Sequence, residues 1–141
     1  MMRKPKIAIG GIILKNNQIL LIKRRDEPDK NKWAIPGGKV EVNESLEMAL
    51  KREMKEETGL NVSKGDLMAV TEFINSSFHY IILDYECHIT SGNIHASSDA
   101  LDIKYFDIDH LDNESINETT RELIEGIRKD VLPVSICHKY I

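Results

Sequence analysis

Three glutamates, Glu53, Glu56 and Glu57, occupy a segment whose apolar residues have helical spacing. At about 100° per residue, Leu46 and Leu50 fall on the face expected to meet the core, and the three carboxylates lie along or beside the same stripe. Like charges at positions i, i+3 and i+4 on an inward face repel one another and lose hydration. A hard divalent cation with oxygen ligands compensates for this, so the spacing favours a magnesium or manganese site. A solvated, glutamate-rich surface is the alternative for an isolated pair of glutamates.

The residues around these glutamates follow the pattern G-x5-E-x7-R-E-U-x-E-E-x-G-U, in which U is a bulky aliphatic residue. The positions that match are Gly38, Glu44, Arg52, Glu53, Met54, Glu56, Glu57, Gly59 and Leu60. This segment resembles the Nudix box, and so many specified positions at fixed spacing rarely coincide by chance. One departure is Asn43, where many members carry glycine. Asparagine tolerates a left-handed backbone, so the turn can be retained.

The resemblance extends beyond the box, over roughly residues 6–128. Arg24-Arg25, followed by Trp33-x-x-Pro-Gly-Gly38, is similar to the usual approach to the box. Tyr105-Phe106 and Asp109 resemble a later strand of the family. The family likeness implies a hydrolase of phosphorus-containing acid anhydrides, in which water attacks a phosphorus of a diphosphate.

The family's metal-binding residues carry over position by position. Glu53, Glu56 and Glu57 are the implied ligands of Mg²⁺, with Mn²⁺ as an alternative, and a carbonyl near Gly38 is a further one. Arg52 is expected to hold a box glutamate in position, and Glu44 to brace the loop. Bound metal neutralises phosphate charge and lowers the pKa of water.

The general base is harder to assign, because the stretch before the last expected strand, HASSDALDIKYF, contains no glutamate. Asp99 is our candidate, with Asp102 or Glu53 as alternatives and a loop aspartate in a turn as the structural interpretation. Arg24 and Arg25 are candidates for binding substrate phosphates, since guanidinium groups suit bidentate contacts. A solvated surface pair is the alternative for these arginines.

Two aromatic residues near these motifs have structural as well as functional interpretations. We expect Trp33 to pack beneath a turn formed by the glycines at 37 and 38. Tyr80 lies in an expected strand that either borders a base pocket or contributes to the core.

Three functions are compatible with these residues. The first is a pyrophosphatase for a nucleoside diphosphate linked to a sugar, with ADP-ribose favoured because the run from His79 to Tyr85 resembles that branch. The second is a nucleoside triphosphate pyrophosphohydrolase, including one that acts on oxidised nucleotides. The third is a nucleotide-sensing module without activity, which would be expected to lose box glutamates or carry a DNA-binding domain. Fold alone does not separate them.

The elements that must position these residues can be placed by periodicity. We expect a central strand over 7–14 forming a hairpin with 18–23, a loop over 24–32, and a short extended piece over 33–38 ending in a glycine turn. A helix should run from Ser45, its N-cap, to Thr58, with Gly59 as its stop. Strands are expected over 67–74, 78–89 and 103–108, with a loop over 91–98. Ser115-x-x-Glu118 has the form of a capping box that begins a second helix.

Strands interleaved with two helices indicate an α/β fold, a Nudix-type α/β/α sandwich with a mixed β-sheet. The 141 residues suffice for a single domain spanning 1–141, with a core over about 6–128 and a loosely attached tail over about 131–141.

Composition and charge limit the classes of binding partner that we expect. A net charge of −4 disfavours nucleic acid, so we expect a nucleotide-derived small molecule. No apolar run approaches the ~20 residues of a membrane span, and the N-terminus does not resemble a signal peptide. Cys87 and Cys137 are expected to be free thiols, and the protein to be soluble and cytoplasmic. The sequence is compatible with a homodimer.

Overall fold

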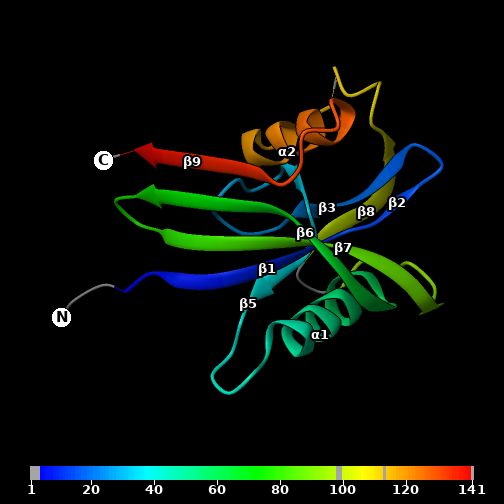
Figure 1. Ribbon diagram of the computed structural model, residues 1–141, viewed down its shortest axis with the longest axis horizontal. Helices are drawn as coiled ribbons and strands as arrows, with labels where there is room; N and C mark the ends of the chain where they lie inside the picture. The colour runs from blue at the N-terminus through cyan, green and yellow to red at the C-terminus, as the bar shows by residue number, and fades with distance from the viewer. Residues whose placement is uncertain (1–3, 98–99, 113, 141) are drawn as a thin grey trace.

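A computed structural model of the chain describes residues 4–97, 100–112 and 114–140. Strands form the middle layer, with α1 (Leu46–Thr58) on one side and α2 (Glu118–Arg128) on the other (Figure 1). The expected α/β/α arrangement with a mixed sheet is confirmed. The strands divide into two sheets rather than one.

The larger sheet has five strands in the order β5-β1-β7-β6-β9. They are β5 (Gly37–Lys39), β1 (Lys6–Ile12), β7 (His79–Gly92), β6 (Leu60–Asn75) and β9 (Val134–Tyr140). β1 runs parallel to β7, and β6 runs parallel to β9, whereas the β1–β5 and β6–β7 pairs are antiparallel. β1 is therefore a central strand, as its continuous apolar run predicts.

The second sheet contains β2 (Leu14–Lys15), β3 (Gln18–Arg24), β4 (Trp33–Ala34) and β8 (Ala100–Asp107). The hairpin is shorter than expected, because only β2 pairs with β3 across the turn while β1 belongs to the other sheet. Asn16 (φ 52°) and Asn17 (φ 63°) both adopt left-handed backbone at that turn. Two successive left-handed residues are what a tight hairpin turn requires.

Helix α1 has the predicted ends. The Ser45 side chain accepts a hydrogen bond from the Met48 N–H at 3.1 Å, and Gly59 closes the helix with φ 80°. Ala49, Leu50 and Met54 are fully buried on its inner face. The N-cap and the left-handed C-cap satisfy backbone groups that would otherwise lack partners, so both ends are fixed locally.

Helix α2 begins later than the sequence predicts, and the proposed capping box starting at Ser115 is wrong. Asn117, not Ser115, is the N-cap, and its side chain accepts from the Thr120 N–H at 3.0 Å. The Ser115 carbonyl instead accepts from Trp33 N–H, and the Trp33 carbonyl accepts from Asn117 N–H. These two backbone bonds anchor the start of α2 on β4.

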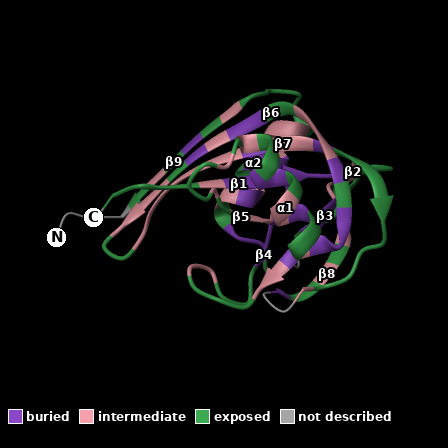
Figure 2. Cartoon of the chain, turned by 90° about the horizontal axis from the view of Figure 1, so that it is seen from below, coloured by how far each residue is buried: buried purple, intermediate pink, exposed green. Residues whose placement is uncertain are grey.

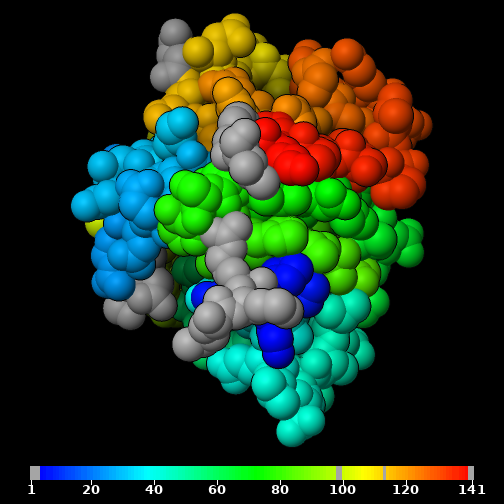
Figure 3. All heavy atoms as spheres, turned by 90° about the vertical axis from the view of Figure 1, so that its left-hand side faces the viewer, coloured from blue at the N-terminus to red at the C-terminus, as the bar shows by residue number. Residues whose placement is uncertain are grey.

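The C-terminal residues are not a loose tail, contrary to expectation. β9 pairs in parallel with β6 from Ala69↔Val134 to Asn75↔Tyr140. In the space-filling view the red C-terminal strand lies against the green β6 (Figure 3). Its centre is anchored by Ile136, which is 4% exposed.

Buried residues concentrate in the strands and on the helix faces that meet them (Figure 2). One cluster packs beneath α2 and includes Trp33 and Phe106, whose ring centroids are 4.8 Å apart. The other packs beneath α1 and includes Leu50 and Met54. Cys87 and Cys137 are free, as expected. Over the described ranges, no helix combines the length and apolar character of a membrane span.

Candidate active site

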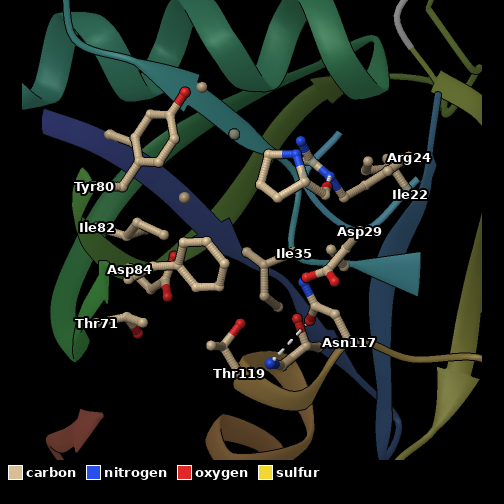
Figure 4. A pocket seen from close by; sticks show the side chains of 18 of the residues that line it. Ile22, Arg24, Asp29, Ile35, Thr71, Tyr80, Ile82, Asp84, Asn117 and Thr119 are labelled. Atoms are coloured by element: carbon tan, nitrogen blue, oxygen red, sulfur yellow. Dashed lines mark hydrogen bonds between the residues drawn. The ribbon is translucent and has the colours of Figure 1, made fainter. Parts of the chain in front are cut away.

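A pocket of about 480 Å³ extends from α1 at one end to the start of α2 at the other (Figure 4). Three neighbouring strands line it, and alternate residues of β6 and β7 face it. Gly10 comes from β1, Thr71 and Phe73 from β6, and Tyr80 and Ile82 from β7. Tyr80 therefore borders the pocket rather than the core, one of the two positions the sequence left open.

Gly37 and Gly38 lie on the wall of this pocket, but they do not form a turn. They belong to β5, paired with Gly10 and Ile9 of β1. A Cβ on Gly37 would overlap the Ile9 carbonyl, and a Cβ on Gly38 would overlap the Glu53 carboxylate. The glycines thus permit close approach of a backbone and a carboxylate, which the sequence pattern alone does not distinguish from a turn.

Arg52 joins the loop before α1 to Glu53 on the helix. Its Nε and Nη2 donate to both oxygens of Glu44 at 2.6 and 2.8 Å, and its Nη1 donates to Glu53 Oε1 at 2.6 Å. Nη2 also donates to the Lys39 carbonyl at 3.0 Å. These bonds to Arg52 lower the pKa of Glu44 to about 2. Asn43 has φ 69°, so the left-handed turn expected at this departure from the box is present.

The three box glutamates have different surroundings. The Glu53 side chain is 13% exposed and faces the pocket, and burial raises its pKa against the opposing effect of Arg52. Glu57 also lines the pocket and accepts from Ser97 Oγ at 3.3 Å. The Glu56 side chain is 59% exposed and lies 3.4 Å from Arg52 Nη1. The structure thus brings Glu53 and Glu57 together at the α1 end of the pocket and leaves Glu56 beside it.

Arg24 and Arg25 both line the pocket. Arg24 is half-buried, and its Nε donates to the Pro28 carbonyl at 2.6 Å. Arg25 lies 3.6 Å from Asp26 at the surface. The two guanidinium groups border the same cavity as Glu53 and Glu57.

Asp99 lies outside the described residues. Asp102, the alternative base, is exposed on β8, and its carboxylate accepts from the Ile103 N–H at 2.8 Å.

Two polar residues of the pocket were not singled out from the sequence. Asp84 on β7 is 7% exposed and Asn117 at the start of α2 is 8% exposed, and both line the cavity. The signal for Asp84 was present, since it is a single charge after the apolar run Ile81-Ile82-Leu83. Asn117 carried no comparable signal, because Ser115 also fitted a helix start.

The chain matches the family model of the NUDIX domain over residues 4–127. It is 39% identical over 109 residues to an ADP-ribose pyrophosphatase of Methanocaldococcus jannaschii, covering 76% of this chain and 64% of the relative. It is 38% identical over 73 residues to an 8-oxo-dGTP diphosphatase of Escherichia coli, covering 51% and 57%. The crystal structure of a MutT NUDIX hydrolase from Burkholderia pseudomallei superposes with a TM-score of 0.82 at 29% identity, covering 89% of this chain and 99% of that one.

The chain therefore belongs to the NUDIX domain family. It spans less than two thirds of the length of each of the two curated relatives described above.

Proposed function

We propose that this chain is a pyrophosphohydrolase that cleaves the diphosphate of a nucleoside diphosphate linked to another group, with ADP-ribose or a nucleotide sugar as substrate. The observation that carries the proposal is a single pocket. It combines the carboxylates of Glu53 and Glu57 at the α1 end with the buried side chain of Asn117 at the α2 end. A volume of about 480 Å³ falls within the range of small-molecule sites. The relative from M. jannaschii is named an ADP-ribose pyrophosphatase.

The donors at the α1 end fit a hard divalent cation. Glu53 and Glu57 supply carboxylate oxygens, and the backbone of Gly38 lies against Glu53. Among the described residues, no group of three or more acidic, histidine or cysteine side chains is already gathered around one point. Mg²⁺ is commonly held by one or two carboxylates and completed by substrate phosphates and water, so this set suffices. When bound, the metal would neutralise phosphate charge and acidify water.

The protein's own groups would then position the substrate. Arg24 and Arg25, which line the pocket, would contact the diphosphate, because guanidinium groups pair well with phosphate oxygens. Arg52 would hold Glu53 through the 2.6 Å bond described above. Glu56 would act with Glu53 and Glu57 as a third ligand if its exposed side chain turns toward the metal.

For the general base, Asp99 remains our candidate on the strength of the sequence. Ser97, two residues earlier in the chain, donates to Glu57 and so lies at the α1 end of the site. Asp99→Asn should lower kcat by roughly 10²–10⁴-fold, with partial rescue at higher pH as hydroxide replaces activated water. Asp102→Asn is the matched control and should change kcat little. The reverse ranking of the two variants in steady-state kinetics would transfer the role to Asp102.

A second candidate function is hydrolysis of nucleoside triphosphates, because the relative from E. coli is named an 8-oxo-dGTP diphosphatase. Product analysis distinguishes the two. ADP-ribose should yield AMP and ribose 5-phosphate without inorganic phosphate, at a higher kcat/KM than any nucleoside triphosphate. Preferential release of pyrophosphate from a triphosphate would favour the second candidate. No turnover of either class with Mg²⁺ or Mn²⁺ would favour the nucleotide-sensing module.

A further inference from the structure

Asp84 is a buried acid that lines the pocket. It lies on β7 opposite Gly10 of β1 and Ala69 of β6, and it is 7% exposed. Within the described ranges, no donor forms a hydrogen bond or ion pair with its carboxyl group. No fully enclosed side-chain oxygen or nitrogen in that part of the chain lacks a partner. The carboxyl oxygens must therefore be reachable from the pocket, where Figure 4 places Asp84 beside Thr71 and Ile82.

The backbone of β1 makes room for this carboxyl group. A Cβ on Gly10 would overlap Asp84 Oδ1, so only glycine at this position leaves the acid in place. Burying a carboxylate without a counter-charge is costly, and burial alone raises the pKa of Asp84 to about 7. The neutral acid is consequently well populated near neutral pH. A neutral carboxyl group presents one O–H donor and one carbonyl acceptor side by side.

The surrounding walls suit a flat heterocycle. Ile35 and Ile82 supply apolar surface next to Asp84, and Phe73 lines the same cavity. Asn117 adds a polar group from the start of α2, and its Oδ1 is already occupied by the Thr120 N–H. Its amide N–H₂ has no partner among the described residues and remains able to donate to a ligand.

We propose that Asp84 is a specificity-determining residue that binds the edge of adenine carrying N1 and the 6-amino group. The carboxyl O–H would donate to N1, and the carbonyl oxygen would accept from the amino group. An ionised carboxylate offers only acceptors, so it would be repelled by the lone pair on N1 of adenine. The ionised form suits guanine instead, because guanine presents donors at N1–H and at its 2-amino group. With the base at the α2 end, the diphosphate would lie toward Glu53 and Glu57. This inference rests on the proposed function for its choice of a nucleoside diphosphate.

Binding of AMP tests the inference without requiring hydrolysis. Calorimetry would compare AMP, GMP and ribose 5-phosphate with the wild-type protein, Asp84→Asn and Asp84→Ala. The asparagine side chain retains one donor and one acceptor in the same place, so Asp84→Asn should bind AMP within about threefold of wild type. Asp84→Ala should bind AMP about 10–100-fold more weakly, since it leaves the adenine edge unpaired in a buried site. Neither variant should alter affinity for ribose 5-phosphate, which has no base.

The matched control is Glu86→Gln, a carboxyl-to-amide change two residues along β7 at a position that does not line the pocket. Its AMP affinity should equal that of wild type. The inference is overturned if Asp84→Ala keeps its AMP affinity, if Asp84→Asn is as weak as Asp84→Ala, or if wild type prefers GMP. Circular dichroism of each variant confirms folding. If Asp84→Ala does not fold, the pH dependence of AMP affinity decides the test, because binding should weaken above pH 7 in wild type relative to Asp84→Asn, and parallel pH profiles of the two proteins would overturn the inference. Failure here with intact ADP-ribose hydrolysis would leave the proposed function standing.

Discussion

At the scale of single residues, the site depends on close approaches that only certain side chains allow. Gly38 leaves the space that the Glu53 carboxylate occupies, and Arg52 holds that carboxylate from the other side. Gly38 and Arg52 together therefore fix the position of the Glu53 carboxylate more tightly than the helix alone would. Adding a single methyl group at position 38 should therefore alter catalysis without unfolding the protein.

We expect Gly38→Ala to displace the Glu53 carboxylate and to lower kcat by about 10–100-fold, the usual effect of disturbing the support of a metal ligand. The melting temperature should fall by only a few degrees. Gly65→Ala is the control, because its Cβ would lie 3.0 Å from the Glu86 carbonyl and neither residue lines the pocket. Steady-state kinetics at saturating Mg²⁺ gives the answer, and equal losses of kcat in both variants would contradict this role of Gly38.

Asp84 should make stability depend on pH. Its pKa rises from an ordinary 3.8 to about 7 on folding, so the folded state holds the proton more tightly than the unfolded state. The resulting stabilisation is complete below about pH 4 and is lost as pH rises through 7. The full change is about 4 kcal/mol at about 1.4 kcal/mol per pKa unit.

Asp84→Asn removes this titration. The variant should therefore gain stability relative to wild type between pH 5 and pH 8, as measured by urea unfolding at each pH. A stability difference between the two proteins that stays constant across this range would show that Asp84 does not titrate as its burial implies.

At the scale of secondary-structure elements, local signals and long-range pairing contribute differently. Ser45 and Gly59 fix the ends of α1 through bonds within a few residues, so the sequence predicts this helix and the box it carries. The position of β9 depends on β6, more than sixty residues away. The alternation of Val134, Ser135 and Ile136 is compatible with a strand, but it does not indicate which strand is the partner. The start of α2 is decided likewise by its docking on Trp33, which selects Asn117 over Ser115.

The C-terminal strand should contribute directly to stability. Ile136 is 4% exposed at the centre of β9, so Ile136→Ala should cost about 2–5 kcal/mol. That corresponds to a fall in melting temperature of several degrees or more for a chain of this length. Ser135→Ala, at an exposed neighbour in the same strand, should change it little. Equal melting temperatures for wild type and Ile136→Ala would indicate that β9 is not held on β6 in solution.

At the scale of the whole molecule, the pocket joins segments that are distant in the sequence. The box could be identified from its spacing, because its residues lie close together in the sequence, on consecutive turns of one helix and in the loop before it. Asp84 and Asn117 could not be grouped with it, because only the pairing of β1, β7 and β6 and the docking of α2 place them in one cavity. Chemistry confined to one element is therefore readable from the sequence, whereas the specificity end of the pocket requires the tertiary structure.

The same arrangement predicts that metal and nucleotide bind cooperatively. Glu53 and Glu57 repel a bound diphosphate when no metal is present, and two carboxylates leave Mg²⁺ incompletely coordinated when no phosphate is present. Mg²⁺ and a non-hydrolysable methylene analogue of ADP-ribose should each raise the melting temperature slightly, and together by clearly more than the sum. A ligand present at about 100 times its Kd stabilises the protein by about 2.7 kcal/mol, which is readily measured.

Glu57→Gln should reduce the excess of the combined shift over the sum of the separate shifts. Glu47→Gln, on the exposed face of α1 and paired with Lys51, should not. Additive shifts, or full hydrolytic activity after exhaustive chelation, would show that the carboxylates do not couple metal to substrate.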